Sequence, residues 1–547
     1  MNHEIATNEL DERTKLLIEI VEKMENEINE KDKELSSKDE EIKKLKNELE
    51  FLKGVISNKN RKIFGVSSEQ VDVNQLSFFN EAEKHSDSKV EEPALEEITY
   101  KRVKKSNYTG KKDNLANLER IVIEHKLEGE DLNCKECGEA LVEIGIKSKK
   151  EIIKYVPAKL IVEEHVIYSY ACKSCEKETG ESNIISTSAP QTIFYNSMAS
   201  NELIAHTLVL KYQYAMPLYR QESYFDMMGA TLSRQTLCNW TMSAAEALEP
   251  IYNNMKKELL NRGYIHADET TLKVINDNGK DSKSKKYMWV YMSNTNSKPV
   301  ILYDYQSTRS SSCPKSFLGD FKGFLQTDGY SGYNSVSNAT RIYCLAHIRR
   351  YFHNIIVDLD EEALKNSRAI LGFNYCEQIY KLEKELRESY SSDENYYDIR
   401  FKVRFEKLTP IIDDFISYVE REIKDALPRS PLGKALDYAK KHLPGLRNVL
   451  LDGSLEVDNN AAERAIKPFV IGRKNFLFAN TAKGATSSAN IYSIVETAKA
   501  NKLVVEKYLV YLFDNLSKID ISDSESLEDL MPWSNKIPEN MKIKDKK

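Results

Sequence analysis

Three acidic residues occupy positions in which a carboxylate is costly unless it is used. Asp268 lies in HADET, among apolar neighbours of a predicted strand, and Asp328 ends another predicted strand in FLQTDGY. Glu463 lies in DNNAAERAIKP, on a predicted helix. A buried carboxylate usually pairs with a base, caps a backbone group or binds a metal ion. Three that meet would repel one another, and two Mg²⁺ ions about 4 Å apart would relieve the repulsion and activate a water or a 3′-hydroxyl for phosphodiester cleavage or transfer.

Each acid also has an ordinary explanation of its own. Asp328 and Gly329 form a common turn dipeptide, and Asp268 can cap a backbone group or form a local salt bridge. Glu463 can pair with Lys467 one turn later on a helix surface. Taken singly, each of the three residues is as well explained by a structural role as by a catalytic one. Only their joint arrangement can distinguish the two roles.

The elements around the acids predict a multidomain α+β fold. Five short strands are predicted in about eighty residues, namely YIHADETTLKVI, KYMWVYMSN, PVILYDYQ, GFLQTDGY and TRIYCLAHIRR. A helix capped by Asp458 carries Glu463 and is predicted to end near Pro468. Aspartates on the first and fourth strands and a glutamate on a later helix describe a ribonuclease-H-like core. This core is predicted over residues 263–355 and 451–500, with a helical insertion at 356–450 and a helical tail at 501–547.

Four of the eight cysteines form two C-x-x-C pairs, Cys134 with Cys137 and Cys172 with Cys175. Two such turns can present four thiolates in the tetrahedron that structural Zn²⁺ prefers, with no position left open for catalysis. The segment EIIKYVPAKLIVEEHVIYSYAC between the pairs alternates like a β-hairpin that would return the second pair to the first. We expect a zinc ribbon at 126–185, and the alternative is four unrelated buried cysteines.

Residues 190–262 are predicted to be helical. PLYRQESYFDMMGATLSRQTLCNW indicates a helix, a turn at a glycine, and a second helix capped by Ser233, which is helix-turn-helix spacing. Arg234, Gln235 and Asn239 on the second helix are then free to meet DNA, while Leu237 and Trp240 are assigned to the core. Many helix pairs turn at a glycine without binding a ligand, so this alternative stays open.

The first sixty residues carry a heptad pattern that predicts a coiled coil and hence a homo-oligomer. One register is formed by Val21, Ile28, Leu35, Ile42, Leu49 and Ile56, and the second by Leu10, Leu17, Met24, Leu45 and Leu52. Lys31 and Lys38 interrupt the second register. The alternative is a single charged helix folded against its own chain. A polar linker is predicted at 61–125, and its basic cluster between Lys101 and Lys112 can contact phosphate or serve as a solvated tether.

Composition gives no global sign of a nucleic-acid binder, because 79 Lys and Arg face 85 Asp and Glu for a net charge of −6. Residues 1–60 hold 11 basic and 16 acidic residues, which accounts for most of that excess, so basic patches can form elsewhere. The acidic N-terminus lacks an apolar leader, and no run of about 18 apolar residues occurs. We therefore expect a cytoplasmic protein that does not insert into a membrane.

The chain resembles the insertion-sequence-66 family of bacterial DDE transposases nearly from end to end. The likeness rests on RKIFGVSSEQ, the C-x-x-C pairs with CGEALVEIG and YVPAKL between them, KYQYAMPLYRQESYF, SRQTLCNW, HADET, TDGYSGYN, CLAHIRRYF, VDNNAAERAIKPFVIGRKNFLF and the tail YLVYLFDNL with LMPW. By this resemblance Asp268, Asp328 and Glu463 correspond to the acidic triad. The family more often has arginine where Lys467 precedes the proline, and the charge is kept.

Several basic residues near the acids have side chains suited to neutralising phosphates. They are Arg349, Arg350, Arg464, Arg473 and Lys474. His347, in CLAHIRR, is predicted to start a helix beside Asp328, where it would contact the scissile phosphate or position a nucleophile. A core-packed histidine is the alternative.

The resemblance implies a nucleoid-associated transposase that binds the terminal inverted repeats of its own element and joins them to target DNA. Two Mg²⁺ ions at the triad, a structural Zn²⁺, synapsis through the coiled coil and accessory proteins of the same element belong to this expectation. Two alternatives remain: a noncatalytic DNA-binding or assembly protein of the same fold, and a ribonuclease-H-like nuclease without strand transfer.

Overall fold

The structure is a computed structural model, and its described part falls into several stretches. It describes residues 158–172, 183–187, 192–194, 197–277, 285–293, 298–357, 359–521 and 523–543, residues 122 and 139, and many positions within 21–52. Residues 87–162 form a unit separate from the rest of the chain. Almost all of the predicted linker at 61–125 lies outside the described residues, as do Cys134, Cys137 and Cys175.

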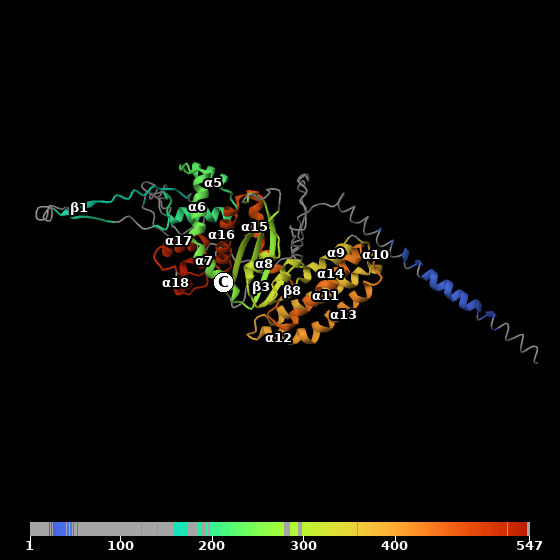
Figure 1. The fold of residues 1–547 in the computed structure, drawn as a ribbon. Coiled ribbons are helices and arrows are strands. Elements are labelled where there is room, and N and C mark those ends of the chain that lie inside the picture. Colours follow the sequence, from blue (N-terminus) through green and yellow to red (C-terminus); the bar gives the residue numbers. More distant parts are fainter. Residues whose placement is uncertain are drawn as a thin grey trace, which may run out of the picture. The chain divides into compact units, whose positions relative to one another are not determined.

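A five-stranded mixed sheet is the centre of the described chain (Figure 1). Its strands are β3 (Tyr264–Leu272), β5 (Lys286–Ser293), β6 (Val300–Gln306), β7 (Gly323–Thr327) and β8 (Ala339–Tyr343). Their order across the sheet is β6-β5-β3-β7-β8. The pairs β3–β5 and β5–β6 are antiparallel, whereas β3–β7 and β7–β8 are parallel. All five predicted strands are confirmed, although the last ends at Tyr343 and its remainder, LAHIRR, belongs to a helix.

The register of β3 and β7 brings two predicted acids to the same level of the sheet. Pairing between these strands ends at His266 and Gln326. Asp268 and Asp328 each follow two residues later on neighbouring strands that run in the same direction. Strands in a sheet lie about 4.8 Å apart, so this register alone predicts that the two carboxylates are neighbours.

The outer edge of the sheet at β6 is covered by helix α16 (Ala482–Ala500). Thr497 Oγ1 accepts a hydrogen bond from Ile301 N at 3.0 Å and donates one to Ile301 O at 2.9 Å. Ser493 Oγ accepts from Tyr303 N at 2.7 Å. Helix side chains thus satisfy backbone groups that an edge strand would otherwise leave open to another strand.

Helix α15 (Asn460–Phe476) packs against β3 and β5, and it corrects one prediction. We expected the helix to end near Pro468, but it continues for two more turns. A proline inside a helix costs about 3 kcal/mol. Ile466 and Phe469 are buried on the sheet side, and burial of each stabilises by about 1.5 to 3 kcal/mol. Packing on the sheet therefore outweighs the local preference of the proline.

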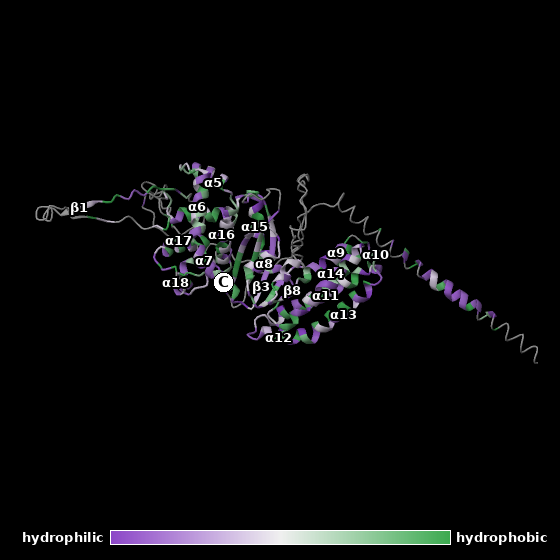
Figure 2. Cartoon of the chain, viewed as in Figure 1, coloured by the Kyte–Doolittle hydropathy of each residue, from purple (hydrophilic) through white to green (hydrophobic). Residues whose placement is uncertain are grey.

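The predicted helical residues 356–450 form a bundle that packs on α9 (Leu345–Ile356). Its helices are α10 (Glu361–Asn366), α11 (Ala369–Tyr390), α12 (Tyr396–Val403), α13 (Thr409–Glu422) and α14 (Pro431–Leu446). Figure 2 shows that apolar and polar residues alternate along these helices. The apolar residues share one core, to which Phe352, Ile379, Phe415 and Leu436 belong.

Two buried arginines of this bundle share the carboxylate of Glu383. Arg400 donates to Glu383 at 2.7 Å and to Glu456 at 2.9 Å. Arg404 donates to the other Glu383 oxygen at 2.7 Å and to the carbonyl of Val449 at 3.1 Å. These bonds connect α11 and the C-terminal end of α12 to the segment between α14 and α15, which contains Val449 and Glu456.

The predicted helix pair is present as α5 (Leu218–Met227) and α6 (Arg234–Ala247). Gly229, in the turn, has φ +91°, a backbone conformation that glycine adopts without strain. Ser233 caps α6 by accepting from Thr236 N at 3.1 Å, as predicted. The assignments of Leu237 and Trp240 to the core are also confirmed. The neighbouring helices are α4 (Asn201–Tyr212), α7 (Glu249–Leu260), α17 (Val505–Leu516) and α18 (Ser524–Asp529).

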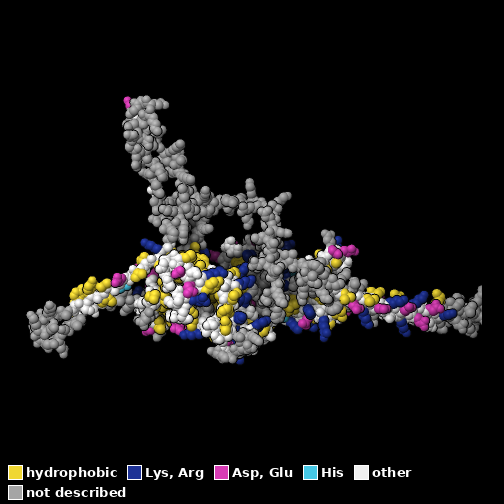
Figure 3. Space-filling model, turned by 90° about the horizontal axis from the view of Figure 1, so that it is seen from above, with side chains coloured by type: hydrophobic (Ala, Val, Ile, Leu, Met, Phe, Trp, Pro, Cys, Tyr) yellow, Lys and Arg dark blue, Asp and Glu magenta, His cyan; other side chains and the backbone are white. Residues whose placement is uncertain are grey.

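The described residues between 21 and 52 are helical. Val21, Ile28, Leu35 and Ile42 from one predicted register are exposed in the single chain, and so is Met24 from the other. Figure 3 shows hydrophobic, basic and acidic side chains interleaved along this helix. The exposed apolar seam is what a coiled coil requires, while pairing with a second chain stays a prediction.

A two-stranded antiparallel sheet ends at Cys172, but its pairing differs from our prediction. Strand β1 (Ser169–Cys172) pairs with β2 (Asn183–Ser186), beyond the second C-x-x-C pair. The described residues 158–168 are not in a strand. Alternation in the sequence marked the strand at Cys172 but did not identify its partner, because alternation carries no information on pairing.

A further two-stranded parallel sheet joins β4 (Val274–Asn276) to β9 (Ala479–Thr481), next to the C-terminal end of α15. Within the described part of the chain, no helix is both long enough and apolar enough to cross a membrane.

Candidate active site

The three predicted acids come from three elements that meet at one end of the sheet. Asp268 lies in β3, and Asp328 directly follows the last residue of β7. Glu463 lies in the first turn of α15, the helix that packs on β3. Burial raises the pKa of Asp268 well above its usual value, and the negative charges of Glu269, Glu463 and Asp328 raise it further. The charges of the three acids therefore act on one another in a poorly solvated place, although the three do not form a group whose ligand atoms all lie within 4.8 Å of one another in the described chain.

Asn459 holds the start of α15 in place. Its Nδ2 donates to the carbonyl of Ala267 at 2.8 Å, and its Oδ1 lies 3.1 Å from His266 Nδ1. Its backbone N–H donates to Cys344 Sγ at 3.2 Å. The helix that carries Glu463 is thereby tied to β3 and to the junction of β8 and α9. Sequence reasoning named Asp458 as the cap, and Asp458 Oδ1 does accept from Asn460 N at 3.1 Å, but the contacts of Asn459 to β3 were missed.

A fourth acid, Glu269, lies beside the triad and was also missed. Its Oε1 accepts from Arg309 Nε at 2.7 Å, and its Oε2 accepts from the Tyr333 hydroxyl at 2.6 Å. Burial and the charge of Asp328 raise its pKa to about 7, against the lowering effect of Arg309 and Tyr333. Arg309 also lies 3.9 Å from Asp328 Oδ2. Glu269 thus has a cation and a hydroxyl partner, and the same cation, Arg309, also reaches Asp328 of the triad.

Glu463 is buried without hydrogen bonds. Its side chain is 7% exposed, and neither carboxylate oxygen has a hydrogen-bond partner. The pairing with Lys467 that would explain this residue structurally is therefore not made as a hydrogen bond. Burial raises the pKa of Glu463 to about 7, and Asp458 and Asp328 add to the rise while Arg350 and Arg464 oppose it. A buried carboxylate in this state is costly unless a ligand satisfies it.

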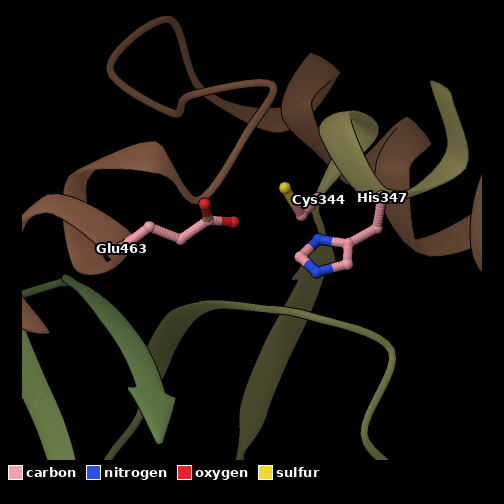
Figure 4. Close-up of side chains that lie close together, drawn as sticks. All are labelled: Cys344, His347 and Glu463. Atoms are coloured by element: carbon pink, nitrogen blue, oxygen red, sulfur yellow. The ribbon is translucent and has the colours of Figure 1, made fainter. Parts of the chain in front are cut away.

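His347 lies in the first turn of α9, close to Glu463 (Figure 4). It is 6% exposed, and both ring nitrogens lack hydrogen-bond partners. Burial and the charge of Arg350 lower its pKa to about 4, so the ring is neutral at pH 7. Ligand atoms of Cys344, His347 and Glu463 all lie within 4.8 Å of one another. The two aspartates are not part of that cluster.

These residues fit a divalent cation. Three mutually repelling carboxylates supply the oxygen ligands that Mg²⁺ prefers, and Glu463 offers two oxygens that nothing else uses. A cation bound there would oppose the burial and the neighbouring negative charges that raise the pKa of Asp268. The arrangement can therefore hold metal ions next to a phosphate group.

Four family models match successive parts of the chain. The largest, described as transposase IS66 family, covers residues 196–487 and so includes the whole sheet and all three acids. The chain belongs to the IS66 family of transposases. The other models are a zinc-finger binding domain of transposase IS66 at 131–176, a transposase C of IS166 homeodomain at 52–123, and an IS66 C-terminal element at 493–533. Membership in the IS66 family makes this chain a transposase with DNA-binding and zinc-finger regions.

Three curated proteins of Sinorhizobium fredii (strain NBRC 101917 / NGR234) are similar to this IS66 chain. The uncharacterized protein y4jD is 29% identical over 425 residues, which cover 75% of the chain and 79% of y4jD. The uncharacterized protein y4qI is 28% identical over 65% of the chain and 66% of its own length. The uncharacterized protein y4hP is 26% identical over 76% of the chain and 74% of its own length.

The polar residues predicted to read DNA lie on the outside of α6. Arg234, Gln235 and Asn239 are all exposed. Gln235 Nε2 donates to Asn239 Oδ1 at 2.9 Å, so the two amides present one connected group. Arg234 lies 3.8 Å from Glu222, in an exposed pair that holds it only weakly. These contacts leave the three side chains accessible to a ligand.

The predicted phosphate contacts differ in how exposed they are. Arg349 donates to Glu377 at 2.5 Å, and Arg473 donates to Thr271 Oγ1 at 3.0 Å, so both have contacts within the protein. Arg464 and Lys474 are exposed, and Arg350 is partly exposed. The charges of Arg350 and Arg464 act on Glu463, which identifies them as the cations nearest the triad in this set.

Proposed function

We propose that this IS66-family transposase cleaves and joins DNA strands at a site formed by Asp268, Asp328 and Glu463 with two Mg²⁺ ions. The observation that carries the proposal is that Asp268 on β3, Asp328 after β7 and Glu463 on the helix packed against β3 act on one another electrostatically: burial, then the charges of Glu269, Glu463 and Asp328, raise the pKa of Asp268. Carboxylates gathered in a buried place without cations destabilise the fold. Selection for metal binding explains why the fold accepts that cost.

The topology of the sheet supports a ribonuclease-H-like core. Along the chain, the first three strands of this sheet form an antiparallel meander, the fourth then joins the first in parallel, and the fifth joins the fourth in parallel. The acids follow the same scheme: one on the first strand, one after the fourth, and one on a helix that follows the helical bundle. The bundle at 356–450 is then an insertion within this core.

The residues of this chain divide the chemistry among them. Bound Mg²⁺ would lower the pKa of an attacking water or 3′-hydroxyl and stabilise the leaving oxygen. Asp268, Asp328 and Glu463 would hold the ions, and Asn459 orients the helix that carries Glu463. Arg350, Arg464 and Lys474 would neutralise phosphates at the entrance. Because the same acids serve hydrolysis and strand transfer, no covalent protein intermediate is needed.

DNA recognition is proposed for regions outside the triad. Arg234, Gln235 and Asn239, on α6, would contact the terminal inverted repeats. A zinc ribbon would contribute to the same recognition, with its Zn²⁺ held by Cys134, Cys137, Cys172 and Cys175. The helix within residues 1–60 would join two chains, so that both ends of the element are held in one homo-oligomeric complex in the bacterial cytoplasm. Target DNA and accessory proteins of the same element complete the set of proposed partners.

The test uses purified full-length protein, Mg²⁺ and labelled element ends, scored for nicked and joined products. We expect both products from the wild type and neither from Asp328→Asn, which should still bind the ends. Asp304→Asn is the matched control, because Asp304 is a strand aspartate of the same sheet whose pKa burial also raises, to about 6. Nicks without joining would identify a nuclease, and binding without nicks would identify a noncatalytic DNA-binding protein.

A further inference from the structure

A thiol and an imidazole stand beside the glutamate of the proposed Mg²⁺ site. Cys344 precedes α9, His347 lies in its first turn, and Glu463 approaches from α15, with their side chains directed toward one another (Figure 4). One ligand atom from each lies within 4.8 Å of the other two. Tetrahedral zinc holds its ligand atoms about 3.3 to 3.8 Å apart, given metal–ligand bonds of about 2.0 to 2.3 Å. Side-chain movements of about 1 Å would close this site around one ion.

The glutamate and histidine atoms of this cluster lack other partners. Both Glu463 oxygens and both His347 nitrogens are buried without hydrogen bonds. Buried polar atoms in native proteins are nearly always satisfied, and a site that binds an ion is one of the ordinary reasons for an exception. Two such residues side by side, both more than nine-tenths buried, point to a ligand that accepts their lone pairs.

The surroundings of Cys344 suit a metal-bound thiolate. Its Sγ accepts a hydrogen bond from Asn459 N at 3.2 Å. Asn459 is itself fixed to the carbonyl of Ala267 and to His266. Hydrogen bonds of this kind orient the ligands of metal sites and support the charge on sulfur. The thiol is therefore held in position before any ion arrives.

The donor set determines which ion this cluster selects. Sulfur and imidazole nitrogen favour Zn²⁺ and similar ions, whereas Mg²⁺ requires oxygen ligands. We propose that Cys344, His347 and Glu463 form a second metal site that takes a thiophilic divalent cation such as Zn²⁺ and, while occupied, withholds Glu463 from the Mg²⁺ site. Three protein ligands leave one position for water, as in open zinc sites. Zinc is then an inhibitor of strand cleavage, an inference that rests on the proposed function.

Binding is tested first, without reference to activity. Full-length protein is stripped of metal and reloaded with Co²⁺, whose bond to a thiolate gives an absorption band. We expect the wild type to hold one more Co²⁺ per chain than Cys344→Ser or His347→Gln, and the difference spectrum removes any contribution from a zinc ribbon. Cys313→Ser is the matched control, because Cys313 is also buried and, within the described chain, its Sγ hydrogen-bonds to Thr308. Equal cobalt content and spectra in wild type and Cys344→Ser would overturn the site.

Inhibition is tested on labelled element ends at fixed Mg²⁺. Each variant is compared with its own rate without zinc, so that a change in basal rate does not matter. At a zinc concentration about ten times the dissociation constant, mass action leaves about a tenth of the wild-type molecules active. Cys344→Ser should lose this inhibition and Cys313→Ser should keep it. Equal inhibition of wild type and Cys344→Ser would refute the regulatory role. A cobalt difference band in a protein that never cleaves DNA would instead refute the proposed function and leave the metal site standing.

Discussion

Two buried clusters of charged residues in this chain are built in opposite ways. In the helical bundle, Glu383 accepts hydrogen bonds from Arg400 and Arg404, and although burial opposes ionisation, the two arginines hold its pKa below the usual value. At the end of the sheet, Glu463 has no hydrogen bond, and burial raises its pKa to about 7. In the first cluster, both oxygens of the carboxylate are satisfied by the protein itself. The second is incomplete, which is how a binding site for a cation differs from a structural ion pair.

The largest expected effect is a loss of strand cleavage when Glu463, in the cluster at the end of the sheet, is replaced. Glu463→Gln should reduce Mg²⁺-dependent strand cleavage by about 10³-fold or more, since metal-bound charge stabilisation is worth several kcal/mol and each 1.36 kcal/mol is tenfold in rate. The melting temperature of the metal-free protein should stay the same or rise, because a repelling charge is removed. Cleavage is measured on labelled ends and melting by calorimetry. Retained cleavage would remove Glu463 from the triad.

The reverse pattern is expected at the cluster in the helical bundle. Glu383→Gln leaves Arg400 and Arg404 without their carboxylate and should lower the free energy of unfolding by about 3 to 5 kcal/mol. Cleavage at a temperature where the variant is folded should remain. Denaturant unfolding measures the loss, and Glu385→Gln, at an exposed position of the same helix, is the control. A variant as stable as the wild type would contradict the structural role.

The pH dependence of stability should separate the two glutamates by sign. Folded Glu463 keeps its proton to about pH 7, whereas the unfolded chain loses it near 4.5. The metal-free protein should therefore lose about 3 kcal/mol of stability from this group as pH rises from 4.5 to 7. Glu383 has a lowered pKa, so its contribution is present above pH 4.5 and is lost as pH falls below that value. Urea unfolding of metal-free wild type and Glu463→Gln, repeated between pH 4.5 and 7, gives the free energy of unfolding at each pH. The two proteins should differ in how steeply this free energy changes with pH. Identical slopes would mean that Glu463 ionises normally.

The smallest effect is expected on the exposed face of α6, where polar groups meet solvent rather than a buried partner. Asn239→Ala should weaken binding to the element ends by about 1 to 3 kcal/mol, the usual worth of one base-reading side chain, and change unspecific DNA binding little. Fluorescence anisotropy with specific and scrambled ends measures both. An equal loss on both DNAs would assign Asn239 to the phosphate backbone.

The sequence was most informative where local pattern and burial agree. Strands β3, β5, β6 and β7, the cap at Ser233 and the three acids were all accessible, because alternation and costly carboxylates are local signals. Pairing was not accessible: β1 joins β2 beyond Cys175, and nothing local specifies a partner. Pro468 misled the prediction, since tertiary packing of α15 outweighs a local preference. Asn459 and Glu269 act through residues distant in the chain, so their roles emerged only from the fold.

The hydroxyl groups of α16 along β6 limit how copies of this protein can assemble. The backbone N–H groups of Ile301 and Tyr303 already donate hydrogen bonds to α16. A strand from a second copy therefore cannot pair along this edge of the sheet. Two catalytic cores brought together on DNA would stay separate bodies rather than fuse into one continuous sheet. Each core could then turn independently to meet its own strand while a tether elsewhere keeps the pair together.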